Sequence, residues 1–301
     1  MRHIISITDL SADEIRTIVT RAVELKAELK EQSANKSLPL QNKSMAMIFD
    51  KPSLRTRLSF EIGMTQLGGH AVYLTPNDIG LGVRETVHDS AIVISSMADI
   101  IIARVSSHEA VKELAKHSSV PVINAMTDME HPCQVLADLQ TIYEHFGSFE
   151  DIKIAYLGDA NNNVTNSLAL AANLLGMEMR VAAPSGFQIS PEISEQAGSK
   201  LLQYSDPKQA VADANVVIAD TWVSMGKEAE RSERLKELLP FQVNESIMAL
   251  ADEKAIFLHC LPAYRGKEVS AEVIDSPQSM VFAEAENRLH AQKALILHIM
   301  A

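Results

Sequence analysis

Short, uninterrupted apolar runs alternate with longer amphipathic stretches along this chain, in two successive series. Continuous apolar runs between helical stretches are typical of parallel strands that helices cover on both faces. The runs span 45–49, 72–75, 100–103 and 120–123 in the first series, and 152–157, 179–183, 216–219, 256–259 and 281–283 in the second. The pattern therefore predicts an α/β fold of two parallel-sheet domains, each with helices on both faces of its sheet.

Gly147-Ser148, between the two series, is the best candidate for a domain boundary. The length of 301 residues agrees with two domains of about 150 residues each. We expect a first domain at 1–147 and a second domain at 148–283. An amphipathic stretch at 284–301 has no strand after it, and Ser11-Ala12-Asp13-Glu14 predicts an early helix that begins with a capping box.

Polar side chains follow several of the predicted strands, at the edge where ligands bind in open parallel sheets. Ser53-Leu54-Arg55-Thr56-Arg57 comes after the first run and before a helical stretch. Two arginines there oppose the helix dipole, at a cost of about 0.3–1 kcal/mol each. A bound anion would reverse that cost, because backbone N–H groups, hydroxyls and guanidiniums would converge on it. The motif favours an oxyanion site; the alternative is that the arginines are solvated or pair with a carboxylate such as Glu61.

Arg104, Asp220 and Cys260 also end predicted strands, and His131 precedes a helix that begins with proline. A histidine in that position is more often a cap than a catalyst. Cys260 follows His259 without further ligands at zinc spacing, so we expect no metal site. A nucleophilic thiolate would need a base, and none is evident in the sequence.

Tyr156-Leu157-Gly158-Asp159 raises the alternative of a nucleotide-binding oxidoreductase, because it joins a predicted strand to a helix. The segment lacks the Gly-x-Gly-x-x-Gly spacing that cradles a pyrophosphate. We therefore expect no nucleotide cofactor.

The charge balance narrows the class of partner. A formal charge of −12 disfavours nucleic acid and anionic membranes as partners. The two cysteines, Cys133 and Cys260, are too few for a disulfide framework and fit a reducing compartment. No apolar run approaches the ~18 residues of a membrane span, and the N-terminus has no signal-peptide hydrophobic region. We expect a soluble cytoplasmic protein.

Four motifs, in order along the chain, resemble those of the ornithine carbamoyltransferases, in the aspartate/ornithine carbamoyltransferase superfamily. They are Ser53-Leu54-Arg55-Thr56-Arg57, His131-Pro132-Cys133-Gln134, Asp220 with Ser224-Met225-Gly226, and His259-Cys260-Leu261-Pro262-Ala263. The first two resemble motifs of the aspartate enzymes as well, whereas the last two indicate ornithine. The resemblance spans essentially the whole chain.

The resemblance implies transfer of the carbamoyl group from carbamoyl phosphate to the δ-amine of L-ornithine. The products would be L-citrulline and phosphate, in arginine and citrulline metabolism, and no cofactor or metal would take part. Relatives that act on putrescine or N-acylated ornithine are the nearest alternatives, and the direction of the reaction stays open. The resemblance also implies a homotrimer or a multiple of it, with active sites at subunit interfaces and a last helix that packs back on the first domain.

Individual site residues follow from the same resemblance. Those implied for carbamoyl phosphate are Ser53, Leu54, Arg55, Thr56, Arg57, Arg104, His131, Gln134 and Arg288. Those implied for ornithine are Asn163, Asp220, Ser224, Met225, Cys260 and Leu261. Four would be catalytic: Arg104 and His131 at the carbamoyl oxygen, and Asp220 and Cys260 at the amine.

Two positions depart from the family pattern. Leu54 stands where a threonine is common, which removes a hydroxyl and keeps the backbone N–H. Gly80 stands where the family commonly has a glutamine that reaches into the neighbouring subunit's site. We expect either that Arg84 supplies the missing contact or that Arg84 caps the next helix or pairs with Glu85 or Asp89.

Overall fold

The computed structural model describes residues 2–32, 37–222 and 231–301. The chain divides into two compact units, Met1–Gln140 together with Glu286–Ala301, and Thr141–Ala285. Each unit contains one sheet whose strand pairs are all parallel, which confirms the predicted fold class. The first unit ends inside helix α6 (Pro132–Phe146), upstream of the boundary expected at Gly147-Ser148.

The sheet of the first unit has the strand order β2-β1-β3-β4. Its strands are β1 (Ser44–Phe49), β2 (His70–Leu74), β3 (Ile100–Arg104) and β4 (Val122–Met126), and all four overlap predicted runs. The chain leaves β1 in one direction to form β2 and later returns to its other side to form β3. This reversal places a topological switch point between β1 and β3, and ligands bind beyond the strand ends at such points.

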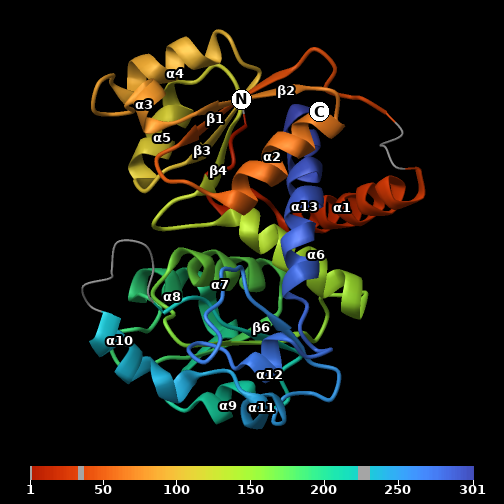
Figure 1. The fold of residues 1–301 in the computed structure, drawn as a ribbon, viewed down its shortest axis with the longest axis vertical. Helices are drawn as coiled ribbons and strands as arrows, with labels where there is room; N and C mark the ends of the chain where they lie inside the picture. Colours follow the sequence, from red (N-terminus) through yellow and green to blue (C-terminus); the bar gives the residue numbers. More distant parts are fainter. Residues whose placement is uncertain (1, 33–36, 223–230) are drawn as a thin grey trace. The chain divides into compact units, whose positions relative to one another are not determined.

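Helices flank this sheet on two sides (Figure 1), with α3, α4 and α5 on one side and α1, α2 and α13 on the other. The helices and the 3-10 turn of the unit are η1 (Ile7–Asp9), α1 (Ala12–Gln32), α2 (Leu54–Gln66), α3 (Pro76–Ile79), α4 (Val87–Ser95), α5 (His108–His117), α6 and α13 (Val281–Met300). Close packing of α13 on α2 depends on Gly63, where an added Cβ would lie 3.2 Å from Cγ of Lys293. The last helix therefore packs on elements of the first domain, as expected.

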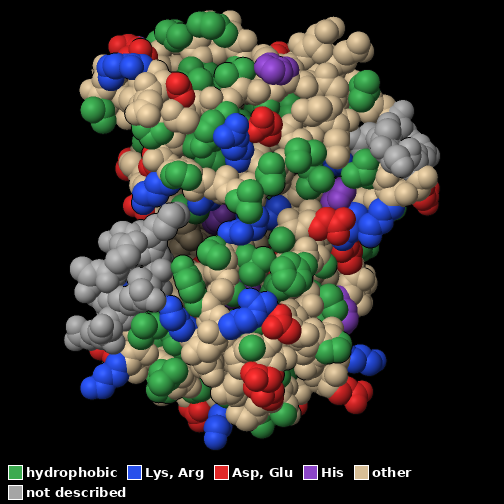
Figure 2. All heavy atoms as spheres, in the orientation of Figure 1, with side chains coloured by type: hydrophobic (Ala, Val, Ile, Leu, Met, Phe, Trp, Pro, Cys, Tyr) green, Lys and Arg blue, Asp and Glu red, His purple; other side chains and the backbone are tan. Residues whose placement is uncertain are grey.

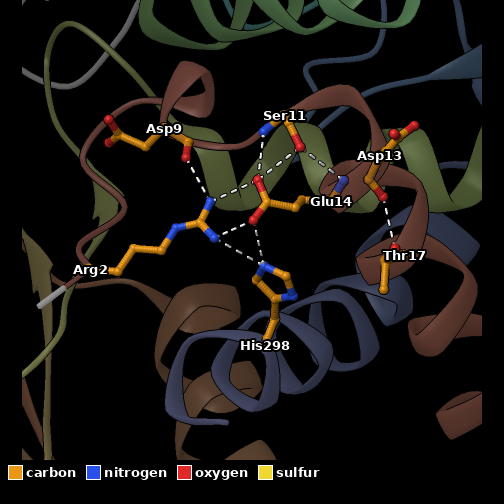
Figure 3. A network of polar contacts seen from close by, with 7 residues as sticks. All are labelled: Arg2, Asp9, Ser11, Asp13, Glu14, Thr17 and His298. Carbon is orange, nitrogen blue, oxygen red and sulfur yellow. Dashed lines mark hydrogen bonds and ion pairs between the residues drawn. The ribbon is translucent and has the colours of Figure 1, made fainter.

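A polar network ties the start of the chain to its last helix (Figure 3). The predicted capping box is present: the backbone N–H of Glu14 donates to Ser11 Oγ at 3.3 Å, and that of Ser11 donates to Glu14 Oε2 at 2.8 Å. The same carboxylate pairs with Arg2 and lies 3.4 Å from Nε2 of His298, in the last turn of α13. Its partnership with Arg2 holds the pKa of Glu14 well below its usual range.

The sheet of the second unit has the order β7-β6-β5-β8-β9. Its strands are β5 (Lys153–Leu157), β6 (Glu178–Ala182), β7 (Leu201–Tyr204), β8 (Val216–Ile218) and β9 (Ile256–Leu258). Strand β7 was not predicted, because its edge position leaves it half exposed and without a continuous apolar run. The strand predicted at 281–283 is wrong: these residues form the first turn of α13, and three apolar residues do not distinguish a strand from a buried helix start.

The helices of the second unit are α7 (Asn163–Leu175), α8 (Pro191–Ala197), η2 (Gly198–Lys200), α9 (Pro207–Val211), α10 (Arg231–Leu238), η4 (Leu239–Phe241), α11 (Glu245–Met248) and α12 (Ala271–Ile274). One buried cluster joins the central strands to α9, α11 and α12. A second switch point lies between β5 and β8, because the chain forms β6 and β7 on one side of β5 and β8 on the other. Among the described residues, no helix is both long enough and apolar enough to cross a membrane.

Candidate active site

The first switch point gathers cationic and amide side chains from distant parts of the chain. Thr56 lies in the first turn of α2, and its Oγ1 accepts a hydrogen bond from Arg104 Nη1, at the end of β3, at 3.0 Å. Nη2 of Arg288, on α13, lies 3.4 Å from the same oxygen. Nη1 of Arg288 donates to Oε1 of Gln134, on α6, at 2.6 Å. Four sequence-predicted residues thus meet in one buried cluster within the first unit.

His131 lies beside these arginines, immediately before α6. Burial lowers the pKa of its imidazole well below the usual value, and the positive charges of Arg288, Arg104 and Arg55 lower it further. The ring is therefore neutral near pH 7. Its Nδ1 accepts the backbone N–H of Gln134 at 3.3 Å, so the remaining ring proton is assigned to Nε2. A neutral imidazole in this state offers one N–H donor and no charge.

Ser53 shapes the start of α2. It is the N-cap residue, and its Oγ accepts the backbone N–H of Thr56 at 3.3 Å. The positive end of the helix dipole and the three arginines described above make this end of α2 suited to an anion.

Arg57 points away from this cluster. Its Nε donates to Oε2 of Glu61 at 2.9 Å, and its guanidinium lies 4.0 Å from the ring centre of Tyr73. Residues two positions apart on a helix lie on nearly opposite faces, so Arg55 and Arg57 cannot both face the same ligand without rearrangement. For Arg57 the structure shows the alternative that the sequence left open, a pair with Glu61.

The second switch point carries acidic and thiol groups. Asp220 follows β8 and Cys260 follows β9, and the two strands are neighbours in the sheet. Sγ of Cys260 donates to Oδ1 of Asp220 at 3.1 Å, and the backbone N–H of Thr221 donates to the same oxygen at 2.6 Å. These two predicted residues are therefore in contact, and both of these hydrogen bonds are made to Oδ1 of Asp220.

The turn after β9 is held by two buried acids, Glu268 and Glu284, that the sequence analysis did not single out. The backbone N–H of His259 donates to Glu284 Oε2 at 2.8 Å, and Nδ1 of His259 accepts the N–H of Leu261 at 2.9 Å. Nε2 of His259 lies 3.4 Å from Oε1 of Glu268. Leu261 has a φ of 57°, which its bond to His259 helps to stabilise. No pattern in the sequence links these acids to the turn, because only folding makes them neighbours.

Among the described residues, one group of side chains could in principle bind a metal ion. It consists of Asp220, His259 and Cys260, whose candidate ligand atoms lie within 4.8 Å of one another. Both ring nitrogens of His259 already face other groups, the Leu261 backbone and Glu268. A metal at this position would have to displace one of those contacts.

Two ornithine-site predictions, Ser224 and Met225, lie outside the described residues. Asn163 is the first residue of α7, after the N-cap residue Asn162. Arg234 stabilises the segments that follow β5 and β8. It forms a buried ion pair with Asp159, and its Nε donates to the carbonyl of Trp222 at 3.0 Å.

Two family models match this chain. The carbamoyl-P binding domain of aspartate/ornithine carbamoyltransferase matches residues 2–144, and the Asp/Orn binding domain matches residues 150–299. The chain belongs to the aspartate/ornithine carbamoyltransferase family.

Relatives in this family match the chain over nearly its whole length. The ornithine carbamoyltransferases of Caldicellulosiruptor saccharolyticus and Methanosarcina acetivorans are each 49% identical to it, over 99% of this chain and 98% and 99% of their own. The solved structure of ornithine carbamoyltransferase from Pyrococcus furiosus superimposes with a TM-score of 0.95 and 45% identity, covering 99% of this chain and 97% of that one.

Membership of the carbamoyltransferase family sets aside the oxidoreductase alternative, and the structure gives Gly158 another role. Its φ is 116°, and an added Cβ would lie 2.6 Å from Nε1 of Trp222. The glycine therefore makes room for a buried indole.

The two departures from the carbamoyltransferase pattern lie on exposed parts of the first unit. Leu54 is exposed at the start of α2. Gly80 has a φ of 57°, and an added Cβ would lie 2.9 Å from Cβ of Arg84. The Arg84 guanidinium folds back on the carbonyl of Asp78. A contact from Arg84 to a neighbouring subunit stays a prediction.

Proposed function

We propose that this carbamoyltransferase acts on L-ornithine, transferring the carbamoyl group of carbamoyl phosphate to the δ-amine to give L-citrulline and phosphate. The observation that carries the proposal is its 49% identity to ornithine carbamoyltransferases over almost the full length of both chains. The cation cluster of the first unit and the acidic site of the second provide groups suited to an anionic and a cationic substrate respectively.

Carbamoyl phosphate is assigned to the first switch point. The N–H groups of residues 53–57 and the hydroxyls of Ser53 and Thr56 would hold the phosphate together with Arg55. Leu54 would contribute its backbone only, and Arg57 would join only after leaving Glu61. Arg288, already on Thr56 at 3.4 Å, would neutralise the same dianion.

Stabilisation of the tetrahedral oxyanion is assigned to Arg104, His131 and Thr56. Attack by the amine places negative charge on the former carbamoyl oxygen, and donors fixed in advance around it lower the barrier. Nε2–H of His131 is a suitable donor, because the lowered pKa keeps the ring neutral near pH 7 and Nδ1 already accepts the N–H of Gln134. Gln134 would donate from its amide to the carbamoyl group.

The amine is assigned to the second switch point. A protonated δ-amine has a pKa of about 10.4 by analogy with lysine, so it must lose a proton before attack. Asp220 would pair with the ammonium group and orient it, with Cys260 beside it. Asn163, Leu261, Ser224 and Met225 complete the proposed ornithine set.

A homotrimer, or a multiple of it, is the proposed assembly. Leu54, Leu58 and Ile62 form an apolar ridge along α2 and are 69%, 47% and 42% exposed; hydrophobic side chains gather over α2 in Figure 2. A hollow of about 680 Å³ lies against this ridge and includes Ser53 and Tyr73 in its lining. Light scattering should report a trimer that Ile62→Asp dissociates, whereas Leu239→Asp, at an exposed position of the second unit, leaves the assembly unchanged.

The proposed cellular setting is cytoplasmic arginine biosynthesis. Both cysteines are free thiols in the structure, which fits a reducing compartment. Complementation of an arginine-requiring strain that lacks its own ornithine carbamoyltransferase would support the biosynthetic direction.

A panel of amines tests the proposed reaction. The purified protein is incubated with carbamoyl phosphate and ornithine, putrescine or N-acetylornithine, and the carbamoylated product is measured by mass spectrometry. We expect citrulline at the highest kcat/KM. Faster turnover of another amine, or no product with any of them, would contradict the proposed substrate.

A further inference from the structure

Asp138 is a buried carboxylate beside the cation cluster that has no part in the substrate assignments above. It lies on α6 and is 2% exposed. A carboxylate buried to this extent is costly unless its oxygens accept hydrogen bonds. Its Oδ1 accepts Nε2 of Gln134 at 2.9 Å, a contact between residues four apart on one helix face.

This contact fixes which way the Gln134 amide points. A side-chain amide has a donor end and an acceptor end. With Nε2 held by Asp138, Oε1 faces the other side, where Nη1 of Arg288 donates to it at 2.6 Å. If the amide turned over, its NH₂ would face the guanidinium and its oxygen would face the carboxylate. Both contacts would then be lost together, because donor would meet donor and acceptor would meet acceptor.

The orientation of Gln134 has a consequence for the proposed phosphate site. Arg288 is long and flexible, and it reaches Thr56 from a helix that begins in the other unit of the chain. Its Nη1 is held by Gln134 while its Nη2 lies 3.4 Å from Thr56 Oγ1. A side chain held in advance loses less conformational entropy when ligand binds, which raises affinity.

We propose that Asp138 is a positioning residue for carbamoyl phosphate: it orients the Gln134 amide and, through it, holds Arg288 on Thr56. The inference rests on the proposed function, because Gln134 and Arg288 are assigned to carbamoyl phosphate there. Asp138 itself touches no substrate. Its effect therefore depends on Gln134, which separates this role from general support of the core.

A double-mutant cycle with Gln134 tests this dependence. Asp138→Leu keeps the branched shape and the number of side-chain heavy atoms but cannot accept a hydrogen bond. We expect it to raise the KM for carbamoyl phosphate, and the inhibition constant of inorganic phosphate, by about tenfold or more, as for loss of a hydrogen bond to a charged group. The KM for ornithine should change less than twofold. In a Gln134→Leu background the same substitution should change the carbamoyl phosphate constants by less than about twofold.

Two further variants separate the accepted hydrogen bond from charge and from stability. Asp138→Asn keeps an oxygen that accepts from Gln134 and should recover most of the affinity. Leu114 is a buried residue of α5, on the other side of the sheet. Leu114→Ala should lower the melting temperature with little change in the KM for carbamoyl phosphate. Should Asp138→Leu fail to fold, Asp138→Ser, whose hydroxyl is too short to reach the amide, takes its place.

Equal effects of Asp138→Leu in both backgrounds, or an Asp138→Asn enzyme as impaired as the Leu variant, would overturn the inference. So would equal losses for carbamoyl phosphate and ornithine. The proposed function fails by a different result, the absence of citrulline formation by the unsubstituted protein.

Discussion

The two switch points occupy equivalent places on their sheets and carry opposite chemistry. In the first unit the site is cationic and joins α2, β3, α6 and α13, which are far apart in sequence. In the second unit it is a thiol and a carboxylate that follow two neighbouring strands. Topology therefore predicts where a ligand would bind in each unit, while the side chains gathered there determine which charge of ligand they suit.

The difference extends to how each site is held. The cationic site is fixed by side chain to side chain contacts among Thr56, Arg104, Gln134 and Arg288. The acidic site is fixed mainly through the backbone, whose N–H groups at Thr221, His259 and Leu261 donate to side-chain acceptors. Substitutions in the first unit should therefore propagate within its site, and those in the second should act more locally.

The largest expected effect is at Arg104. Arg104→Met removes a guanidinium that is held on Thr56 and assigned to the oxyanion. We expect kcat to fall by about 10²–10³, as for loss of one oxyanion donor. Steady-state kinetics with both substrates saturating measure it. Arg265→Met, which removes an exposed arginine paired with Asp275 in the second unit, is the control. If kcat of Arg104→Met fell by less than tenfold, Arg104 would not be a catalytic residue.

Asp220 tests whether the two sites are separable. Asp220→Asn keeps the shape and removes the charge that would pair with the ornithine ammonium. We expect kcat/KM for ornithine to fall by about 10–100-fold, since a hydrogen bond to a charged group is worth about 1.5–3 kcal/mol. The inhibition constant of inorganic phosphate, which reports on the first site, should stay within twofold. Equal losses in both measurements would show that Asp220 supports the fold.

Lys293 tests whether burying positive charge in the first unit costs stability. Its side chain on α13 is fully buried, donates to Gln66 Oε1 at 2.8 Å, and has a pKa that burial lowers to about 8. Between pH 8 and about 10 the unfolded chain keeps a proton that the folded chain has lost, so stability rises with pH. Relative to Lys293→Met, the unsubstituted protein should gain about 1 kcal/mol per pH unit in this window.

Denaturant unfolding at several pH values measures this gain. Lys112→Met, which removes an exposed lysine on α5, is the control variant. If the difference in free energy of unfolding between Lys293→Met and the unsubstituted protein did not change with pH, the surroundings of Lys293 would stabilise its ammonium group fully.

The smallest expected effect is at Arg57. This prediction tests which arginines of α2 belong to the cationic site. Arg57→Ala breaks an exposed pair with Glu61 and should change the KM for carbamoyl phosphate by less than about threefold. Arg55→Ala, on the opposite face of α2, should raise it by tenfold or more. Equal effects would mean that Arg57 leaves Glu61 when the phosphate binds, and that the site includes both arginines.

The pattern of apolar runs was sufficient to predict the two parallel sheets, because a strand buried on both faces must be apolar throughout. Eight of the nine predicted strands are present, and the ninth, at 281–283, is the first turn of α13. Strand β7 was missed since an edge strand need not be apolar on both faces. The segments after β1, β3, β8 and β9 located Thr56, Arg104, Asp220 and Cys260 at the switch points, although the resemblance rather than their spacing assigned them to substrates.

What the sequence by itself determined is local: the capping box at Ser11, the buried strands, and the polar segments where strands end. The tertiary structure decided which of those segments share a site and which faces their side chains take. It placed Arg288 on Thr56 and Arg234 on Asp159, pairs that are remote in the chain, and it turned Arg57 towards Glu61. The physical reason is that a buried charge is tolerated only where folding brings it a partner, and local sequence does not specify a partner that lies far along the chain.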